Sequence, residues 1–493
     1  MNVHAERRFN LVDEGWIPVA EKGLVSLKRV FTDSDLSALG GNPVEKIALI
    51  KLFLAIAQAT YTPSDETEWA SIGWNGLSKK VSDYLTDKKD LFWLYGDKPF
   101  LQMPTIAKAD IQTFSAVLPN IATGNTTLLL QSQIEKPLND SEKALLLVFL
   151  SGFALGGKQT DNSVVLTPGY SLKTKAGKPG PSLGFLGYLH SFLTGRSLIE
   201  TVWLNWMTHE QLEQLSLFPG GIGTPPWEKM PEGEACIVAT NLTQSLMGRL
   251  LPLCRFALLA EDGLHYSEGI LHPTHKNGGF DPSITVDFSN DPKAVWVDPE
   301  KRPWRQLTSL LSFFNSESEQ TFDCYQIHSG VLRARKTMPG FCIWSGGLRV
   351  KFNSGEQGVK GNDDFVESET YLSSDWIGEA WFTRLKSEMT TLDEMSKTIF
   401  SAVSGYCQSQ KMDKKTKIAK SAMTQSLFWQ MCEKKFQELV YACGDDQGEK
   451  ASALRPFFTG YADTVYNRFC PKETARQIEC WAKHRPNLGR FLK

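Results

Sequence analysis

Two stretches of the sequence, FNLVDEGWIPV at 9–19 and KPFLQMP at 98–104, decide how the chain is interpreted. In the first, apolar residues flank the polar triplet 13–15, which predicts an N-terminal strand with a turn inside it. The residues expected to anchor that strand are Leu11, Trp16, Ile17 and Val19. In the second, two prolines bracket a segment that we expect to be extended, because proline restricts the backbone of the residue before it. Its inward-packing side chains are expected to be Phe100, Leu101 and Met103.

Length and composition indicate a globular protein of two or three domains. The chain has 493 residues, of which 41% are hydrophobic and 22% charged, and these are ordinary values for a folded soluble protein. No uninterrupted apolar run approaches the roughly 18 residues of a membrane span. Residues 1–8 are polar and lack the apolar core of a signal peptide. We therefore expect a cytoplasmic protein that does not contact a membrane.

The charge balance limits the kinds of ligand. The formal net charge is −2, whereas a protein that binds nucleic acid on its own is usually basic. The chain is therefore expected to touch nucleic acid through local patches or not at all. Nine cysteines are scattered without a CxxC pair, which predicts reduced thiols and no zinc ribbon, metal or other cofactor.

The predicted fold class is α+β, with a large, mixed and irregular N-terminal domain at 1–372 and a C-terminal four-helix bundle at 373–493. In the first domain, apolar spacing predicts helices at 43–60, 141–155, 198–207 and 304–314, and strands at 235–239, 294–297, 341–344 and 348–352. Asp140 or Ser141 is expected to cap the second of these helices. In the second domain, four long periodic segments with short breaks predict antiparallel helices at 377–408, 413–443, 448–466 and 471–484.

Glycines and lysines follow the second predicted helix. Gly156 and Gly157 either cap that helix at its C-terminus or form a backbone loop that can approach another molecule closely. Lys158 follows them, and a Lys/Gly/Pro loop comes later. That loop, with Lys173, Lys175 and Lys178, is either solvated or in contact with phosphates.

Three further segments have both a plain and a functional interpretation. Residues 122–129, with Asn125, Thr126 and Leu128, form a polar turn or a loop that offers hydrogen-bond donors. Residues 345–360 form a hairpin with solvated tips, or a strand edge that brings basic, aromatic and amide side chains together, a combination suited to separating nucleic-acid strands. A basic helical stripe is either a solvated face or a path for DNA, and comprises Lys411, Lys414, Lys415, Lys417 and Lys420.

Histidines and carboxylates between 261 and 281 raise the alternative of a metal-dependent nuclease. The residues are Glu261, Asp262, His265, His272, His275 and Asp281. Such a centre needs histidine and aspartate side chains that converge on a cation. The segment has no HExxH motif and is interspersed with glycine and proline, which favours an irregular loop.

The wording and spacing of 9–19 and 98–104 resemble the CasA family, the large subunit of the type I-E CRISPR surveillance complex Cascade. The segment GRSLIETVWLN at 195–205 resembles a helix of that family that follows its glycine-rich loop. The family combines a mixed N-terminal domain with a C-terminal four-helix bundle, as expected here.

The resemblance implies roles for the candidate residues. Gly156, Gly157 and Lys158 would approach the minor groove of the protospacer-adjacent motif in duplex DNA. Lys351 or Asn353 would read that motif after a Gly346-Gly347 turn, with Phe352 as the wedge. The 122–129 loop, with its Asn125, Thr126 and Leu128, would reach the guide RNA and the motif, although Leu128 stands where a relative can carry Phe. The DNA backbone would contact Lys173, Lys175, Lys178, Lys414, Lys417 and Lys420.

The implied function is that of a non-catalytic subunit that recognises the motif, promotes strand separation and helps recruit a helicase–nuclease. Its partners would be the guide-RNA-bearing backbone, small and handle-binding subunits, the target duplex and that effector. Guide pairing, and not this chain, would read the target sequence. The alternatives are a metal-dependent nuclease built on the His265–Asp281 cluster and a scaffold that makes no DNA contact.

Overall fold

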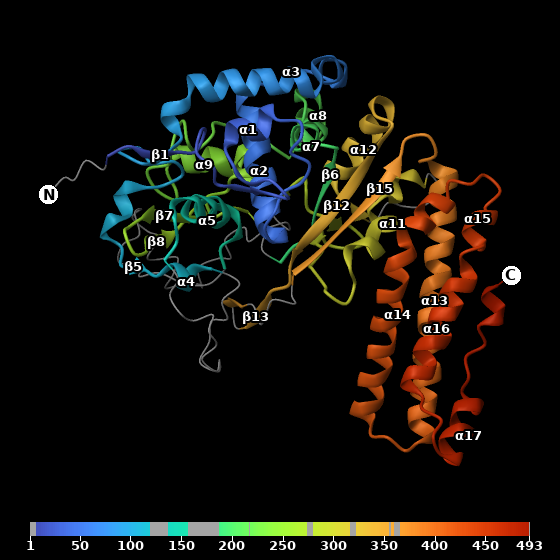
Figure 1. Ribbon diagram of the computed structural model, residues 1–493. Coiled ribbons are helices and arrows are strands. Elements are labelled where there is room, and N and C mark those ends of the chain that lie inside the picture. The colour runs from blue at the N-terminus through green and yellow to red at the C-terminus, as the bar shows by residue number, and fades with distance from the viewer. Residues whose placement is uncertain are drawn as a thin grey trace. The chain divides into compact units, whose positions relative to one another are not determined.

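The computed structural model describes residues 6–118, 137–155, 187–215, 217–273, 280–315, 322–353, 356–358 and 365–492 (Figure 1). The chain divides into two compact units. The first comprises residues 1–303, 321–337 and 341–369, and the second comprises 304–320, 338–340 and 370–493. None of the described helices has the length and apolar character needed to cross a membrane.

The first unit mixes helices with small sheets. Its helices are α1 (Leu27–Thr32), α2 (Pro43–Thr60), α3 (Glu66–Asp87), α4 (Phe114–Val117), α5 (Asp140–Phe153), α7 (Leu198–Asn205), α8 (His209–Leu215), α9 (Ile237–Thr243), α10 (Met247–Leu250) and α12 (Tyr325–Thr337). Its strands are β1 (Arg8–Asn10), β2 (Ile17–Val19), β3 (Gly23–Val25), β4 (Trp93–Tyr95), β5 (Ile111–Gln112), β6 (His190–Thr194), β7 (Arg255–Leu259), β8 (Leu264–Glu268), β9 (Val286–Asp287), β10 (Lys293–Ala294), β11 (Phe322–Asp323), β12 (Gly340–Leu348), β13 (Lys351–Asn353), β14 (Glu356–Gly358) and β15 (Phe365–Ser373), the last of which continues into the second unit.

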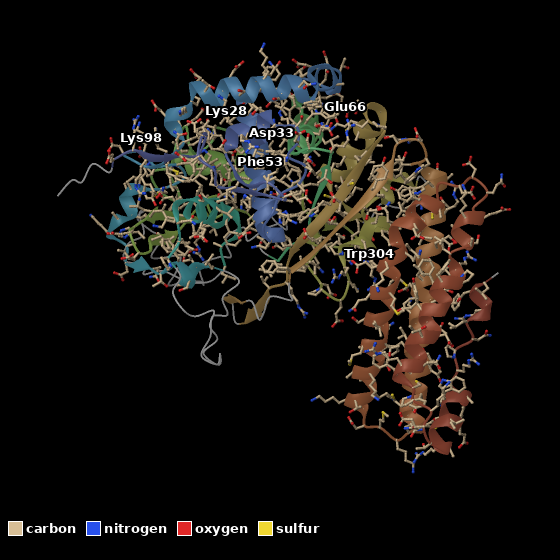
Figure 2. All side chains as sticks on the ribbon, in the orientation of Figure 1. Lys28, Asp33, Phe53, Glu66, Lys98 and Trp304 are labelled. Atoms are coloured by element: carbon tan, nitrogen blue, oxygen red, sulfur yellow. The ribbon has the colours of Figure 1, made fainter. Side chains whose placement is uncertain are left out.

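The sheets are small because most strands are short. The described strands pair in the orders β15-β12-β6, β5-β8-β7, β10-β9-β11, β1-β4, β2-β3 and β13-β14. Helix α2 supplies much of the core and contacts α3, α5, α7 and α10. It is apolar around almost its whole circumference, as expected of a helix buried on all sides. Phe53, labelled in Figure 2, lies on this helix, and its ring packs edge-on against Phe31.

The apolar residues expected to anchor the two stretches that opened the sequence analysis are buried, but the second stretch is not extended. Leu101 has a φ of 53°, and residues 100 and 101 form a turn. Gln102 holds this turn in place, because its amide donates to Leu94 O at 2.7 Å and accepts from Leu259 N at 2.8 Å. The inward packing expected of Phe100, Leu101 and Met103 is confirmed.

Several sequence-based predictions of local structure were wrong. The strand predicted at 235–239 is the start of helix α9, whose N-cap is Cys236. Helix α5 is capped by Asn139, which forms a capping box with Glu142 and so outcompetes the two residues expected as caps. The helix predicted at 304–314 is divided into two 3-10 turns and the short α11 (Leu307–Leu310).

The second unit is a helical bundle. Its helices are α13 (Glu379–Ser409), α14 (Lys414–Ala442), α15 (Glu449–Ser452), α16 (Arg455–Phe469) and α17 (Ala475–Lys483). The helix predicted at 448–466 is split into α15 and α16, with a proline in the first turn of α16, a position that proline tolerates. Residues 304–320 belong to this unit, where the ring of Trp304 lies 4.5 Å from that of Phe436. The predicted α+β fold class with a C-terminal bundle is confirmed.

Candidate nucleic-acid interface

The candidate residues fall into three groups. Outside the described residues lie Asn125, Thr126, Leu128, Gly156, Gly157, Lys158, Lys173, Lys175 and Lys178. Lys351, Phe352 and Asn353 form strand β13, whose backbone is described. Lys414, Lys417 and Lys420 lie on α14. For the first group, the structure describes the residues on either side of each segment and the contacts that fix them.

Helix α5 separates two of the candidate segments, since 119–136 precedes it and 156–186 follows it. The helix has 14 residues, so its ends are about 20 Å apart at a rise of about 1.5 Å per residue. At its N-terminal end, Asp140 accepts hydrogen bonds from Arg8 and Tyr95, each at 2.7 Å. The ammonium of Lys143 lies 5.3 Å from the centre of the Phe114 ring. This contact links a residue that precedes 119–136 to one that follows it.

The C-terminal end of α5 is fixed to strand β7. Ser151 O accepts from Cys254 N at 2.8 Å, and Leu155 O accepts from the Arg255 guanidinium at 3.0 Å. Arg255 is itself buried and forms an ion pair with buried Glu268. The C-cap is Ala154, in an extended conformation. Neither Gly156 nor Gly157 is therefore the C-cap, which was one of the two interpretations of the glycine pair.

Gly187, the first described residue after 156–186, lies against the base of the β13–β14 hairpin. Gly187 has a φ of 100°, and its carbonyl accepts from Val297 N at 2.9 Å. A Cβ atom on Gly187 would lie 2.5 Å from Val350 and 2.6 Å from Trp296. Since Val350 immediately precedes β13, Gly187 lies beside the start of the hairpin.

The β13–β14 hairpin is present, but the Gly346-Gly347 pair before it is not a turn. Both glycines lie within β12, where Gly346 is paired with His190 of β6. A Cβ on Gly346 would lie 2.7 Å from the Trp344 ring, and one on Gly347 would lie 2.7 Å from Tyr188 O. These glycines allow close packing inside the sheet, and counting from a turn at this pair is therefore unsound. In the hairpin, Lys351 is opposite Gly358, Phe352 opposite Gln357, and Asn353 opposite Glu356.

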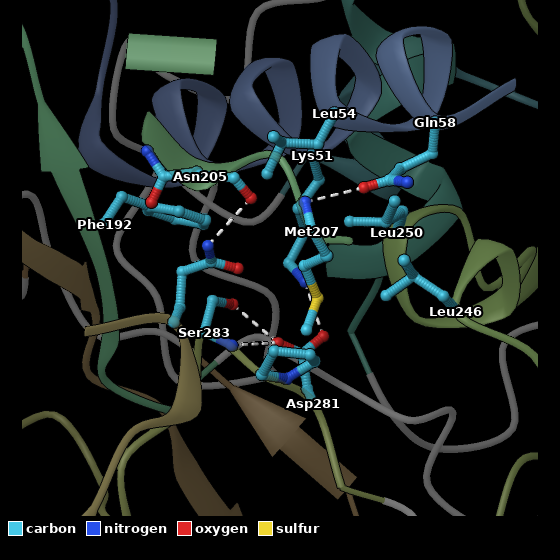
Figure 3. Close-up of a pocket in the computed structure, with 12 residues that line it drawn as sticks. Lys51, Leu54, Gln58, Phe192, Asn205, Met207, Leu246, Leu250, Asp281 and Ser283 are labelled. Carbon is cyan, nitrogen blue, oxygen red and sulfur yellow. Dashed lines mark hydrogen bonds and ion pairs between the residues drawn. The ribbon is translucent and has the colours of Figure 1, made fainter. Parts of the chain in front are cut away.

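The first unit also contains a buried ion pair between Lys51 and Asp281 (Figure 3). Lys51 of α2 donates to Asp281 Oδ2 at 2.5 Å and to Arg249 O at 3.1 Å. The two charged side chains are 2% and 0% exposed. Burial would raise the pKa of Asp281, but the Lys51 ammonium and neighbouring donors hold it below its ordinary value. The cavity beside the pair has a volume of about 10 Å³, which suffices for about one water molecule.

This ion pair is connected to the loop anchors through a short polar chain. Asp281 Oδ1 accepts from both the backbone N–H and the hydroxyl of Ser283, at 2.9 and 2.6 Å. The Ser283 hydroxyl is 3.0 Å from His190 Nδ1. The His190 ring lies 5.6 Å from that of Phe153, the last residue of α5. Serine, histidine and aspartate thus meet here, but Ser283 donates to the aspartate and the histidine is fully buried, so this is a packing network and not an accessible nucleophile.

The side chains proposed for a nuclease are engaged elsewhere. His272 Nδ1 is 2.9 Å from the Arg249 guanidinium, and its Nε2 is 2.7 Å from Pro252 O. Burial, assisted by Arg249, lowers the pKa of His272 to about 3. Asp281 is neutralised by Lys51, and His275 lies outside the described residues. Within the described ranges, no three His, Cys, Asp or Glu side chains gather as metal ligands.

The basic stripe on α14 is only partly a surface feature. Lys414 is exposed, in the first turn after the N-cap Asp413. Lys417 and Lys420 are half-buried, and both lower the pKa of the Cys407 thiol, which burial raises overall. Lys414 is thus the best placed of the three for a phosphate contact.

Comparisons with known proteins agree with this architecture. The sequence profile of the family described as CRISPR-associated protein Cse1 matches residues 10–466. The CRISPR-associated protein CasA/Cse1 of Thermus thermophilus is 26% identical over 332 residues, which cover 62% of this chain and only 60% of that relative's length.

Solved structures share the fold over nearly the whole chain. The crystal structure of CasA from Thermus thermophilus superposes with a TM-score of 0.74 at 18% identity, covering 98% of this chain and 99% of that one. A chain of a structure described as a CRISPR RNA-guided surveillance complex superposes with a TM-score of 0.69 at 15% identity, covering 98% and 99%. The match of the family profile along nearly the whole sequence shows that this chain belongs to the Cse1 family of CRISPR-associated proteins.

Proposed function

We propose that the chain is the large, non-catalytic subunit of an RNA-guided DNA surveillance complex. In this role it recognises the protospacer-adjacent motif in duplex DNA, promotes strand separation and helps recruit a helicase–nuclease. Membership of the Cse1 family supports the proposal, as does the fold shared with a chain of an RNA-guided surveillance complex. The net charge of −2 fits a subunit that docks on other proteins and touches DNA through a few loops.

The observation that carries the proposal is the meeting of Gly187 with Val350. A Cβ atom on Gly187, the first described residue after 156–186, would lie 2.5 Å from Val350, the residue that precedes β13. The candidate wedge therefore begins beside the residue at which the described chain resumes after the glycine pair and the lysines. A minor groove is narrow, and a loop without side chains can enter it while a neighbouring hairpin acts on the adjacent base pair.

The anchors also explain how such loops could work on DNA without unfolding the protein. Opening a base-pair step costs a few kcal/mol, so the group that inserts must be braced. Here the bracing comes from buried groups, notably the Arg255–Glu268 ion pair at one end of the segment and the network around Asp281 at the other.

The experiment that tests the proposal is reconstitution with and without this chain. The chain is co-expressed with guide RNA and the remaining subunits, and duplex binding is measured with a correct and a scrambled motif. We expect binding to discriminate the two duplexes only when the chain is present. If the assembled complex discriminates equally well without it, the chain is a scaffold. Cleavage of DNA by the isolated chain with Mg²⁺ or Mn²⁺ would favour the nuclease alternative.

A further inference from the structure

One tryptophan of the chain is exposed, and it belongs to the first unit. All 14 tryptophans lie in the parts of the chain that the structure describes, and all except Trp296 are buried or half-buried. The exposed fraction of Trp296 is 40%. A single exposed apolar side chain is ordinary on a protein surface, so its surroundings must show whether it serves a ligand.

The Trp296 ring lies next to the start of the β13–β14 hairpin. A Cβ atom on Gly187 would lie 2.6 Å from the Trp296 ring and 2.5 Å from the Val350 side chain. The ring and that side chain therefore cannot be farther apart than these two distances combined, about 5 Å. Phe352 follows Val350 by two residues, which span at most about 7 Å of backbone. With the Val350 side chain included, Trp296 is within about 15 Å of the Phe352 backbone, the length of four to five base-pair steps.

Trp296 is held in place by both its backbone and its ring. Its backbone forms an antiparallel bridge with Tyr188, and the next residue, Val297, donates its N–H to Gly187 O at 2.9 Å. The Tyr188 ring packs edge-to-face against the Trp296 ring, with the centroids 4.8 Å apart and an interplanar angle of 65°. The exposed ring is thus braced by the protein, so a ligand that stacks on it meets a surface that is already ordered.

A braced tryptophan at this place suits an unpaired base. Every base has an aromatic face that can stack on such a ring, and this stacking tolerates any sequence. A base inside a duplex has both faces covered by its neighbours, so it gains nothing from the ring until its pair is opened. An exposed tryptophan beside a strand-separating hairpin therefore favours opened DNA over paired DNA.

We propose that Trp296 is a stacking platform for a base of the target DNA that has been unpaired beside the β13–β14 hairpin. This inference rests on the proposed function, because it requires that DNA is opened at the hairpin. The two aromatic groups then have different roles: Phe352 separates a base pair, and Trp296 holds one of the separated bases and slows re-pairing. The platform is not expected to select a sequence.

The test uses the reconstituted complex and duplexes that carry 2-aminopurine at single positions beside the motif. The fluorescence of this base analogue is quenched by stacking and rises when the base is unstacked. With the unmodified chain, we expect one or two of the unpaired positions to stay quenched after the DNA has opened. Trp296→Leu should raise the fluorescence at those positions alone and speed R-loop collapse at least about fivefold, the lower limit for one base stacked on an aromatic ring. Trp296→Phe should keep most of the quenching, because it keeps an aromatic face.

Phe288→Leu is the matched control, because Phe288 is an aromatic residue of the same unit with a similar exposed fraction, 37%. It should change neither the quenching nor the rate of collapse, and all three variants should stay folded, since the substituted side chains are exposed. If the unmodified complex does not open DNA next to the motif, the proposed function fails and the platform fails with it. If the unmodified complex opens DNA and Trp296→Leu behaves in the same way, only the platform is refuted. Loss of other subunits from the Trp296→Leu complex would also overturn the assignment, because the ring would then be a protein contact.

Discussion

Two ion pairs, one fully buried and one partly buried, show how differently the two units are built. In the first unit, Lys51 and Asp281 are 230 residues apart in sequence, and their charged side chains are 2% and 0% exposed. In the second, Glu388 and Arg455 are 67 residues apart and are 8% and 18% exposed. The first pair joins helix α2 to a segment outside any helix or strand, whereas the second reinforces helices that already pack along their length. The chain that flanks the candidate loops and the hairpin belongs to the first unit, which depends on such distant polar contacts, whereas the candidate lysines of α14 lie in the second.

The largest expected effect comes from breaking the first pair. Lys51→Met leaves the Asp281 carboxylate buried without a counter-charge, which should cost about 3–5 kcal/mol of unfolding free energy. Glu388→Gln in the second unit should cost about 1 kcal/mol, because the amide still accepts a hydrogen bond and the pair is partly solvated. Urea unfolding followed by tryptophan fluorescence measures both. Equal losses for the two variants would contradict the contrast drawn between the units.

Acid should weaken the first unit through His272. Its pKa is about 3 in the folded chain, against about 6.5 when unfolded. Between these two pH values the unfolded chain binds more protons than the folded chain. The contribution of His272 to the free energy of unfolding is therefore fully present above pH 6.5 and is lost as the pH falls, by about 1.4 kcal/mol per pH unit. His272→Gln should flatten this slope between about pH 6.5 and 5. A parallel slope in the variant would show that other groups govern the loss.

The contrast between the units also determines what could be predicted from sequence. Helix α2 was predicted at its observed bounds, and α13 and α14 nearly so, since an apolar period and a cap are local signals. The pairing of Lys51 with Asp281 has no local signal, because a lysine inside an apolar helix does not reveal which distant carboxylate meets it. Asp281 was instead grouped with His265, His272 and His275 in the nuclease alternative, because these residues lie close together in sequence.

Glycines were the least reliable signal. Gly346 and Gly347 were interpreted as a turn but lie inside a strand, where neighbouring rings and carbonyls leave no room for a Cβ. Close packing and turn formation both require glycine, and only the surrounding structure separates them. The sequence also did not reveal that helix α5 ends at Ala154, two residues before the glycine pair. Ala154 is extended and ends the helix without a glycine.

A substitution in the β13–β14 hairpin should slow the opening of duplex DNA without changing the stability of the protein. Phe352→Ala should slow R-loop formation on fully paired DNA by the equivalent of roughly 1–3 kcal/mol, and a pre-opened bubble beside the motif should restore the rate. Lys351→Ala and Asn353→Ala should instead reduce discrimination between motifs by a similar amount. Unfolding free energies should not change. Normal opening by Phe352→Ala would move the wedge to another residue of the hairpin, such as Gln357.

The smallest effect is expected in the second unit. Lys414→Ala should lower the salt dependence of duplex binding by about 0.9 in the logarithmic slope, the value for one phosphate contact. Lys417→Ala and Lys420→Ala should change it less, because these side chains are half-buried. Titrations of the assembled complex at several salt concentrations give the slopes. Identical slopes for all three variants and the unmodified chain would show that these lysines lie on a solvated face of α14 and do not contact DNA.

The most direct test of the proposed function is motif-dependent duplex binding by complexes that carry Gly157→Asp. A carboxylate there would repel phosphates, and its side chain would block entry to the groove. Gly460→Asp, on an exposed and uncrowded position of α16, is the matched control. We predict that Gly157→Asp abolishes the preference for the correct motif without altering thermal unfolding, while Gly460→Asp retains it. Full motif preference in the Gly157→Asp complex would contradict the assignment of this loop to the DNA.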